Sequence, residues 1–247
     1  MDSPTLHAKC CTNSADVATL GIGSKLPTSQ GHGTVGLLLR RNDSTNLLVS
    51  TAAHNGDPKP ECELTKVADI CNDELGSDMA LYSIANPAIW SRLNSLSDIT
   101  FTDESGVKRK PKQAVSGIHE HITDDYVYDN LDSTRAESKD EFLFTVGSIT
   151  QSYVSVYMAN IREVSRSRIQ INGVRLEGTG MLLKCDIESI QGDSGACLLL
   201  EKSGKVHAIG VLTGGGRHSD GSSFAYFTQF SDLTNLNEIC VAGEQVV

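Results

Sequence analysis

Short apolar runs separated by glycine and small polar residues are the feature that most restricts the fold of this chain. Thr34–Arg40 and Asn46–Ser50 are two such runs, and Met79–Ile84 is a third, closed by Asn86 and Pro87. The sequence contains 22 glycines, and many Ser, Thr and Asn residues lie between the runs. Strands end at such residues, whereas long helices need longer periodic segments. The pattern therefore predicts an all-β protein built from many short strands.

The strand signals form two groups with a polar connection between them. Residues 1–32 show no sustained period and are predicted to form an N-terminal arm, residues 33–135 the first group with the polar connection, and residues 136–247 the second group. The strands expected in the second group are Glu141–Ser148, Tyr153–Ala159, Arg168–Ile171, Met181–Ile187, Cys197–Leu200, Val206–Thr213 and Ser223–Phe230. Apolar residues at helical spacing then predict a C-terminal helix over Ser231–Ile239.

The charge of the chain disfavours a nucleic-acid partner. The formal net charge of the 247 residues is −10, and the long basic runs that phosphate binding requires are missing. The one basic stretch, Lys108–Lys112, is interpreted as a solvated loop, with an anion-binding or proteolytically exposed site as the alternative. Residues 1–20 contain no apolar core of a secretory signal, and no later segment approaches a membrane-spanning length. A membrane partner is therefore not expected.

The cysteines favour a reducing compartment over a disulfide framework or a metal site. Seven is an odd number, so at least one cysteine is unpaired, and none lies in a Cys-x-x-Cys pair. A zinc ribbon or finger is therefore not expected. His7–Cys11 is the nearest approach to a ligand cluster, but we do not interpret it as a metal site. We predict no metal, no organic cofactor and an intracellular (cytoplasmic) location.

Three short segments carry groups suited to acyl transfer. An apolar strand ends in small residues and His54, Asp78 opens another strand, and Ser194 lies within Gly192–Gly195. A serine hydroxyl is a weak nucleophile near pH 7, so a base must take its proton. Histidine titrates near that pH, and a buried carboxylate can hold its ring in place. We therefore predict that His54, Asp78 and Ser194 are catalytic.

The glycine before the nucleophile suggests how a developing negative charge would be held. Gly192 has no Cβ, so the loop can turn tightly and direct the amides of Gly192 and Ser194 into one oxyanion hole. Simpler interpretations exist for each group: a serine in a glycine-rich turn, a core histidine at position 54, and a strand-capping Asp78. His32, between two glycines, is the other histidine to test as a base.

At these segments the sequence resembles the chymotrypsin-like serine protease family. The similarity lies in Thr51–His54, Asp78–Leu81 and Gly192–Gly195, which follow the family's order of His, Asp and Ser. It implies two antiparallel six-stranded β-barrels with a C-terminal helix, an active site between the barrels and cleavage of peptide bonds without a cofactor. Weaker similarities are the first strand of the second barrel at Phe144–Thr150, the substrate-pairing strand at Ile209–Gly215, the last pocket strand at Ala225–Thr228 and the terminal helix at Leu233–Ile239.

Two departures from the family concern its disulfides and its activation. Asn55 follows the histidine, where secreted members usually have a disulfide-bonded cysteine. Secreted members also create a new amino terminus that pairs with the aspartate before the nucleophile, and no such sequence follows a basic residue here. Asp193 must therefore find another partner, and activation by ordinary zymogen cleavage is not expected. The arm segment Leu20–Gly23 is a candidate to take the place of such an amino terminus.

The resemblance also suggests a substrate pocket. Counting back along the nucleophile loop places Glu188 near the pocket floor, where a carboxylate would favour a basic residue at P1, the position before the scissile bond. That Glu188 points to solvent is an equally weighted alternative. Leu212 stands where glutamate-specific relatives place a histidine, which argues against an acidic P1 residue. The other residues expected to bind substrate are Ser189, Thr213, Gly214, Gly215 and Ala225.

Two other functions remain open beside a serine endopeptidase. One is a catalytically inactive or latent protease-like binding module, which would result if Asp193 lacked a partner. The other is a different serine hydrolase such as an esterase, although that fold requires Gly-x-Ser-x-Gly and a histidine after the serine. The expected partner is a protein or peptide substrate, and a regulatory partner or activator is a further candidate.

Overall fold

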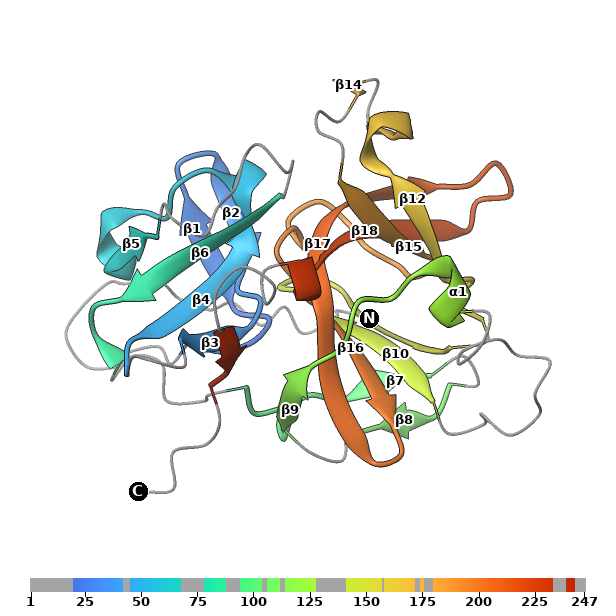
Figure 1. Cartoon of the computed structure of the whole chain (residues 1–247), viewed down its shortest axis with the longest axis horizontal. Coiled ribbons are helices and arrows are strands. Elements are labelled where there is room, and N and C mark those ends of the chain that lie inside the picture. Colours follow the sequence, from blue (N-terminus) through green and yellow to red (C-terminus); the bar gives the residue numbers. More distant parts are fainter. Residues whose placement is uncertain are drawn as a thin grey trace, which may run out of the picture.

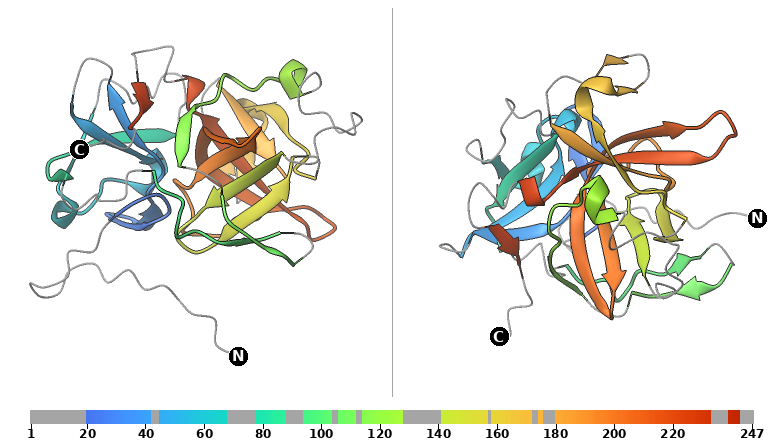
Figure 2. Two further views of the ribbon diagram at one scale, coloured as in Figure 1. Left: turned by 90° about the horizontal axis from the view of Figure 1, so that it is seen from below. Right: turned by 45° about the vertical axis from the view of Figure 1, so that its right-hand side comes forward.

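The structure, a computed structural model, describes residues 20–41, 45–67, 78–87, 94–103, 106–111, 114–127, 141–156, 158–171, 174–175, 180–232 and 239–242. As predicted, the chain is mostly β-sheet, and its strands form two halves that lie side by side (Figures 1 and 2). No helix in these ranges is long and apolar enough to span a membrane.

The N-terminal half contains a five-stranded sheet in the order β19-β3-β4-β6-β5. Its strands are β3 (Leu38–Arg41), β4 (Leu47–Ala52), β5 (Leu64–Lys66), β6 (Met79–Ile84) and β19 (Ile239–Val241). The first two apolar runs of the sequence supply β3 and β4, which pair antiparallel. A second hairpin, β1 (Lys25–Thr28) with β2 (Gly31–Thr34), lies beside this sheet (Figure 1).

The C-terminal half contains an eight-stranded sheet with the main order β11-β10-β16-β17-β18-β15-β12, and β9 pairs with β17. These strands are β9 (Val115–Ile118), β10 (Phe142–Val146), β11 (Gln151–Ser155), β12 (Arg162–Ser165), β15 (Met181–Cys185), β16 (Cys197–Lys202), β17 (Lys205–Arg217) and β18 (Ser223–Gln229). The predicted runs of this half therefore contribute strands, but Tyr153–Ala159 is extended only as far as Ser155, and in Arg168–Ile171 only Gln170–Ile171 is extended, because Arg168 ends a helical turn.

The remaining elements are short. Two-stranded pairs join β7 (Phe101–Thr102) to β8 (Lys108–Arg109) and β13 (Gln170–Ile171) to β14 (Val174–Arg175). The helical pieces are η1 (Ala53–Asn55), η2 (Pro60–Cys62), α1 (Asp124–Tyr126) and η6 (Arg166–Arg168). Two of them, η1 and η6, matter for the site.

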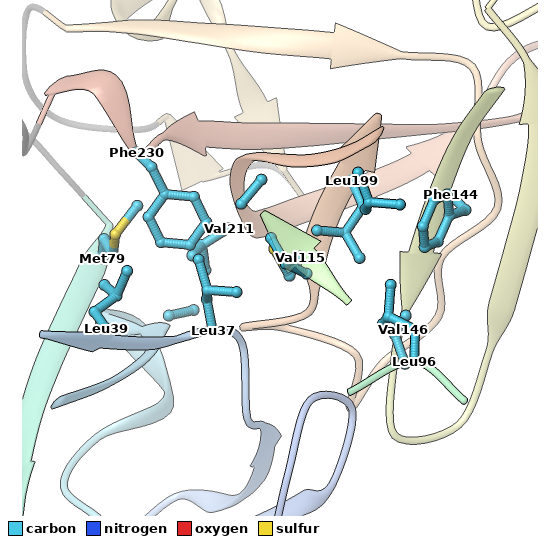
Figure 3. Close-up of a cluster of buried hydrophobic side chains, with 14 of the residues drawn as sticks. Leu37, Leu39, Met79, Leu96, Val115, Phe144, Val146, Leu199, Val211 and Phe230 are labelled. Atoms are coloured by element: carbon cyan, nitrogen blue, oxygen red, sulfur yellow. The ribbon is translucent and has the colours of Figure 1, made fainter. Parts of the chain in front are cut away.

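One hydrophobic cluster joins the two halves. Leu37 and Met79 from the first half pack in the same buried cluster as Phe144, Val211 and Phe230 from the second (Figure 3). Burial of apolar side chains is the main force that favours such packing. The cluster therefore fixes how the two halves sit against each other, and the site lies where they meet.

The expected boundaries differ from the observed ones in two places. The arm predicted over residues 1–32 includes the β1–β2 hairpin from Lys25 onward, in which Leu26 is fully buried. The first group predicted over residues 33–135 includes β9, which pairs with β17 of the second half and buries Val115 in the joint cluster. Local periodicity reveals that a segment is a strand but not which sheet it joins.

The implied pair of antiparallel six-stranded barrels also needs correction. The sheets have five and eight strands, the β9–β17 pair is parallel, and within the described residues neither sheet's two end strands pair with each other. Most of the predicted C-terminal helix lies outside the described residues, but Ile239 begins β19 and pairs with β3 of the first half. The second group, predicted to run to residue 247, therefore gives a strand to the first.

Candidate active site

Two antiparallel strands bring His54 and Asp78 together. The β4–β6 register pairs Ala52 with Met79, so the residues just beyond this pair lie at the same end of the sheet. His54 follows in η1, and Asp78 immediately precedes β6. The amide of Ala53 donates to the Asp78 carbonyl at 3.0 Å, which fixes this corner. The predicted pair is therefore positioned by backbone pairing.

A line of hydrogen bonds connects Asp78, His54 and Ser194. Asp78 is buried, and its Oδ1 accepts from the His54 amide at 3.0 Å while its Oδ2 lies 2.7 Å from His54 Nδ1. His54 Nε2 lies 3.0 Å from Ser194 Oγ. With Nδ1 donating to the carboxylate, Nε2 is the nitrogen left to accept the serine proton. The structure thus brings the three residues predicted to be catalytic together, with His54 between Asp78 and Ser194.

The surroundings of His54 raise its pKa above the ordinary value. Partial burial opposes the charged imidazolium, but the hydrogen bond that His54 donates to Asp78 and the negative charge of that carboxylate outweigh it. The positive charge of Arg166 acts in the opposite direction and lowers the pKa. The pKa of His54 therefore depends on both a carboxylate and an arginine.

The loop that carries Ser194 is held against the N-terminal half. The Ser194 carbonyl accepts from the Thr34 amide at 2.8 Å and from Asn55 Nδ2 at 2.9 Å. Gly195 has a φ of 98°, and a Cβ there would overlap the Thr34 carbonyl. Only glycine combines this conformation with such a close approach. Ser194 therefore belongs to the second half but is anchored by the first.

Asp193 finds its partners in the main chain. It is buried, and its Oδ1 accepts from the amides of Ile149 and Thr150 at 2.9 and 3.1 Å, while Oδ2 accepts from the Ile190 amide at 3.2 Å. Backbone amides stabilise a buried carboxylate without a cation. This answers the question that the sequence left open about the partner of this residue.

The candidate oxyanion loop lies next to His32. Gly192 has a φ of 104°, and its carbonyl accepts from Thr34 Oγ1 at 2.9 Å and from Ser148 Oγ at 3.1 Å. A Cβ on Gly192 would lie 2.6 Å from His32 Nε2. His32 thus borders the loop, but the imidazole nitrogen within hydrogen-bonding distance of Ser194 Oγ is His54 Nε2. The role of the Gly192 and Ser194 amides stays a prediction.

A pocket of about 670 Å³ opens beside Ser194. Besides His54, Asp78 and Ser194, it is lined by four of the residues predicted to bind substrate, namely Ser189, Thr213, Gly214 and Gly215. The last three belong to β17. The strand that resembles the family's substrate-pairing strand, Ile209–Gly215, therefore contributes to the pocket lining.

Two residues predicted to bind substrate do not line the pocket. Glu188 is exposed, and its carbonyl accepts from Ser152 Oγ at 3.0 Å. Ala225 is fully buried in β18, where it pairs with Gly215 and Cys185. The predicted carboxylate at the pocket floor is therefore wrong, and the solvent-facing alternative for Glu188 is the one observed. A count along a loop does not fix the direction in which a side chain points.

The pocket also has lining residues that the sequence analysis did not assign: Arg166, Ile190, Gln191, Gly216 and Arg217. The two arginines change the charge of the pocket from the expected negative to positive. The arginines of the segment 162–168 were visible in the sequence, but no local pattern connects them with Ser194.

The described residues contain no cluster of three or more His, Cys, Asp or Glu side chains that could hold a metal ion. Cys185 and Cys197 are fully buried, and burial raises the pKa of both thiols. A buried thiol with a raised pKa is a poor nucleophile. Cys197 is thus a small core residue.

Comparison with solved structures identifies the fold. Thermobifida fusca protease A matches with a TM-score of 0.54 and 17% sequence identity over 90% of this chain and 98% of the other. Nocardiopsis protease matches with a TM-score of 0.52 and 17% identity over 90% and 98%. Cellulomonas bogoriensis chymotrypsin matches with a TM-score of 0.50 and 16% identity over 90% and 97%.

The sequence comparisons add nothing to this result. No protein-family model matches the chain, and no curated protein matches it. At 16–17% identity the structural matches establish a shared fold. The chain has the chymotrypsin-like protease fold.

Proposed function

We propose that the protein is a serine endopeptidase. The observation that carries this proposal is the line from Asp78 through His54 to Ser194, with separations of 2.7 and 3.0 Å, beside an open pocket. The fold shared with proteases supports it. A protein or peptide is then the substrate.

The arrangement supports a two-step hydrolysis. Ser194 Oγ attacks the peptide carbonyl carbon while its proton moves to His54 Nε2, and the buried Asp78 stabilises the resulting imidazolium. The C–N bond then breaks as His54 gives its proton to the leaving amine, which leaves an ester on Ser194. Water attacks the ester, its proton passes to His54 and then to Ser194 Oγ, and a carboxylic acid is released. The amides of Gly192 and Ser194 are proposed to hold the oxyanion.

The anchored Asp193 favours a competent enzyme over an inactive binding module. The inactive alternative assumed that this carboxylate lacks a partner, whereas three backbone amides donate to it. The loop around Ser194 is thereby supported without a new amino terminus.

The experiment that tests the proposal is digestion of a diverse peptide library, read by mass spectrometry. The Ser194→Ala variant is expected to lower kcat by roughly 10⁵-fold, because nucleophile and base act as a unit. Ser97→Ala is the matched control, because Ser97 is exposed and outside the pocket lining, and it should cleave like the parent.

A fluorophosphonate probe distinguishes the alternatives. Labelling of the parent but not of Ser194→Ala, together with peptide cleavage, supports the endopeptidase. Labelling and hydrolysis of small esters without any peptide cleavage would replace it with an esterase. A folded parent that neither cleaves nor reacts would replace it with a binding module.

A further inference from the structure

The pocket beside Ser194 carries positive charge that its own carboxylate does not balance. The ionisable side chains on its lining are His54, Asp78, Arg166 and Arg217. Asp78 directs one carboxylate oxygen to the His54 amide and the other to the His54 ring, at 3.0 and 2.7 Å. Its charge therefore belongs to the catalytic histidine. Two guanidinium groups remain.

Arg166 is short of hydrogen-bond acceptors. It begins η6 directly after β12, and its amide donates to the Gly180 carbonyl at 2.9 Å, which fixes the turn. Its Nε and Nη1 atoms are buried, and within the described part of the chain neither has a hydrogen-bond partner. A charged group buried without partners is unfavourable, because it has lost water and gained nothing in return. An anion entering the pocket would compensate this charge.

Arg217 brings the second charge from another element. It ends β17, where it pairs with Ser223 of β18, and its side chain is exposed. Within the described residues its Nη1 lies 3.4 Å from the Gly221 carbonyl, beyond the usual N–H···O range. In Figure 1, β12 and the β17–β18 hairpin lie on the same side of the C-terminal half. The two arginines thus reach one pocket from separate elements, η6 and β17.

The acidic side chains near this end of β17 are already engaged. Asp186 lies 3.0 Å from His218, 3.0 Å from Asn160 and 3.7 Å from Lys184. Asp220 accepts from the amide and hydroxyl of Ser222 at 2.9 and 2.6 Å. Neither residue lines the pocket. These carboxylates therefore do not balance the two guanidinium groups within it.

Part of the pocket wall is closed. Gly215 and Ser189 lie so close that a Cβ on the glycine would overlap the serine hydroxyl. These two residues therefore form a continuous stretch of the pocket lining.

We propose that this pocket receives the side chain of an acidic residue, Asp or Glu, at the P1 position of the substrate. Arg166 is the principal counter-charge, and Arg217 is the second at the pocket edge. Guanidinium–carboxylate pairs are strong because both charge and hydrogen bonding contribute. This inference rests on the proposed endopeptidase function, and it replaces the basic preference expected from Glu188. Leu212 argued against an acidic P1 residue only because it is not a histidine, and arginines supply the missing charge.

The first test compares kcat/KM for peptides that differ only at P1, with Glu, Gln, Leu and Lys in turn. The parent is expected to prefer Glu over Gln by about 10- to 100-fold, the range typical of charge-assisted hydrogen bonds. Arg166→Gln should remove most of this preference while cleavage after Gln persists. Arg168→Gln is the matched control, because Arg168 belongs to the same turn but is exposed and outside the lining.

The second test measures binding without catalysis. Ser194→Ala should bind a peptide amide with Glu at P1 more tightly than its Gln counterpart, and adding Arg166→Gln should abolish the difference. Ser194-dependent cleavage that prefers Lys or Leu overturns the acidic pocket and leaves the protease intact. Glu-selective binding by Ser194→Ala with no cleavage by the parent keeps the pocket and overturns the protease. Binding that ignores the P1 residue overturns the pocket.

Discussion

The Asp193 carboxylate is paired with backbone amides, which bears on whether the protein needs an activating cleavage. In secreted relatives the corresponding aspartate pairs with an amino terminus created by cleavage, as the family resemblance implies. Here the amides of Ile149, Thr150 and Ile190 donate hydrogen bonds to the Asp193 carboxylate. These donors are part of the folded backbone, so they are present as soon as the loop around Ser194 forms.

Arg166 should also control how the reaction depends on pH. Its positive charge lowers the pKa of His54, and the base must be neutral to accept the serine proton. Arg166→Gln removes this repulsion, so the pKa of His54 rises. The acidic limb of the pH profile is therefore expected to move to higher pH. We would measure it as the rate of fluorophosphonate labelling against pH, which avoids effects on peptide binding.

The control for this profile is again Arg168→Gln. That variant removes one positive charge from the same turn without touching the pocket lining. An unchanged acidic limb in Arg166→Gln, or an equal movement in both variants, would contradict a specific effect of Arg166 on His54.

At the scale of elements, β17 connects the pocket with the core. Its residues Thr213–Gly215 line the pocket, while Val211 lies in the cluster that joins the two halves. The β17–β18 register shifts between Leu212 and Gly214, just where the strand leaves the core. Such irregularities re-aim side chains near functional sites. β17 is thus paired with β18 both before and after this shift in register.

Gly215→Ala should therefore impair peptide binding more than reaction at Ser194. A Cβ there would lie 2.6 Å from the Phe224 carbonyl and would overlap Ser189 Oγ, so it narrows the pocket. We expect KM for peptides to rise about tenfold or more, while the fluorophosphonate labelling rate changes little. Steady-state kinetics and labelling together check this.

Gly117→Ala in β9 provides the comparison. A Cβ at that position would meet its nearest neighbour, His207 Cδ2, at an ordinary 3.7 Å. Both kinetic constants should stay at the parent's values. A normal KM in Gly215→Ala would show that the substrate does not bind against the part of the pocket lining formed by Gly215 and Ser189.

The part of this site that could be predicted from sequence was the part carried by local pattern. His54, Asp78 and Ser194 each lie in a short segment whose residue types already suit its role. Arg166 and Arg217 have no such segment, because their place in the pocket depends on how the elements that carry them, η6 and β17, come together in the fold. Likewise, the strands themselves follow from apolar runs, but the parallel β9–β17 pair and the β19–β3 pair join distant segments, and periodicity contains no information on partners.

On the scale of the whole molecule, β19 ties the end of the described chain to its first sheet. It pairs with β3 and lies against β9, and Ile239 is buried in the cluster shared by both halves. The site requires the halves to stay in register, since His54 comes from one and Ser194 from the other. The contribution of β19 to stability should therefore be measurable.

Ile239→Ala is expected to lower the free energy of unfolding by about 2–4 kcal/mol, because it leaves a cavity among packed apolar side chains. Urea unfolding of the full chain, followed by circular dichroism, measures it. Val107→Ala is the control, since Val107 is 52% exposed and its truncation should change stability by less than about 0.5 kcal/mol. Equal, small effects of both variants would show that β19 adds little to the fold.

The late position of β19 has a consequence for how the protein is made. A ribosome produces β3, β4 and β6 long before it produces residues 239–241, so one edge of β3 remains without its partner until the second half has been synthesised. Open strand edges are where strands of other molecules add, and incompletely folded chains aggregate through them. The nascent chain is therefore most exposed to misassembly during its own translation, and its last described strand closes the vulnerable edge of its first sheet.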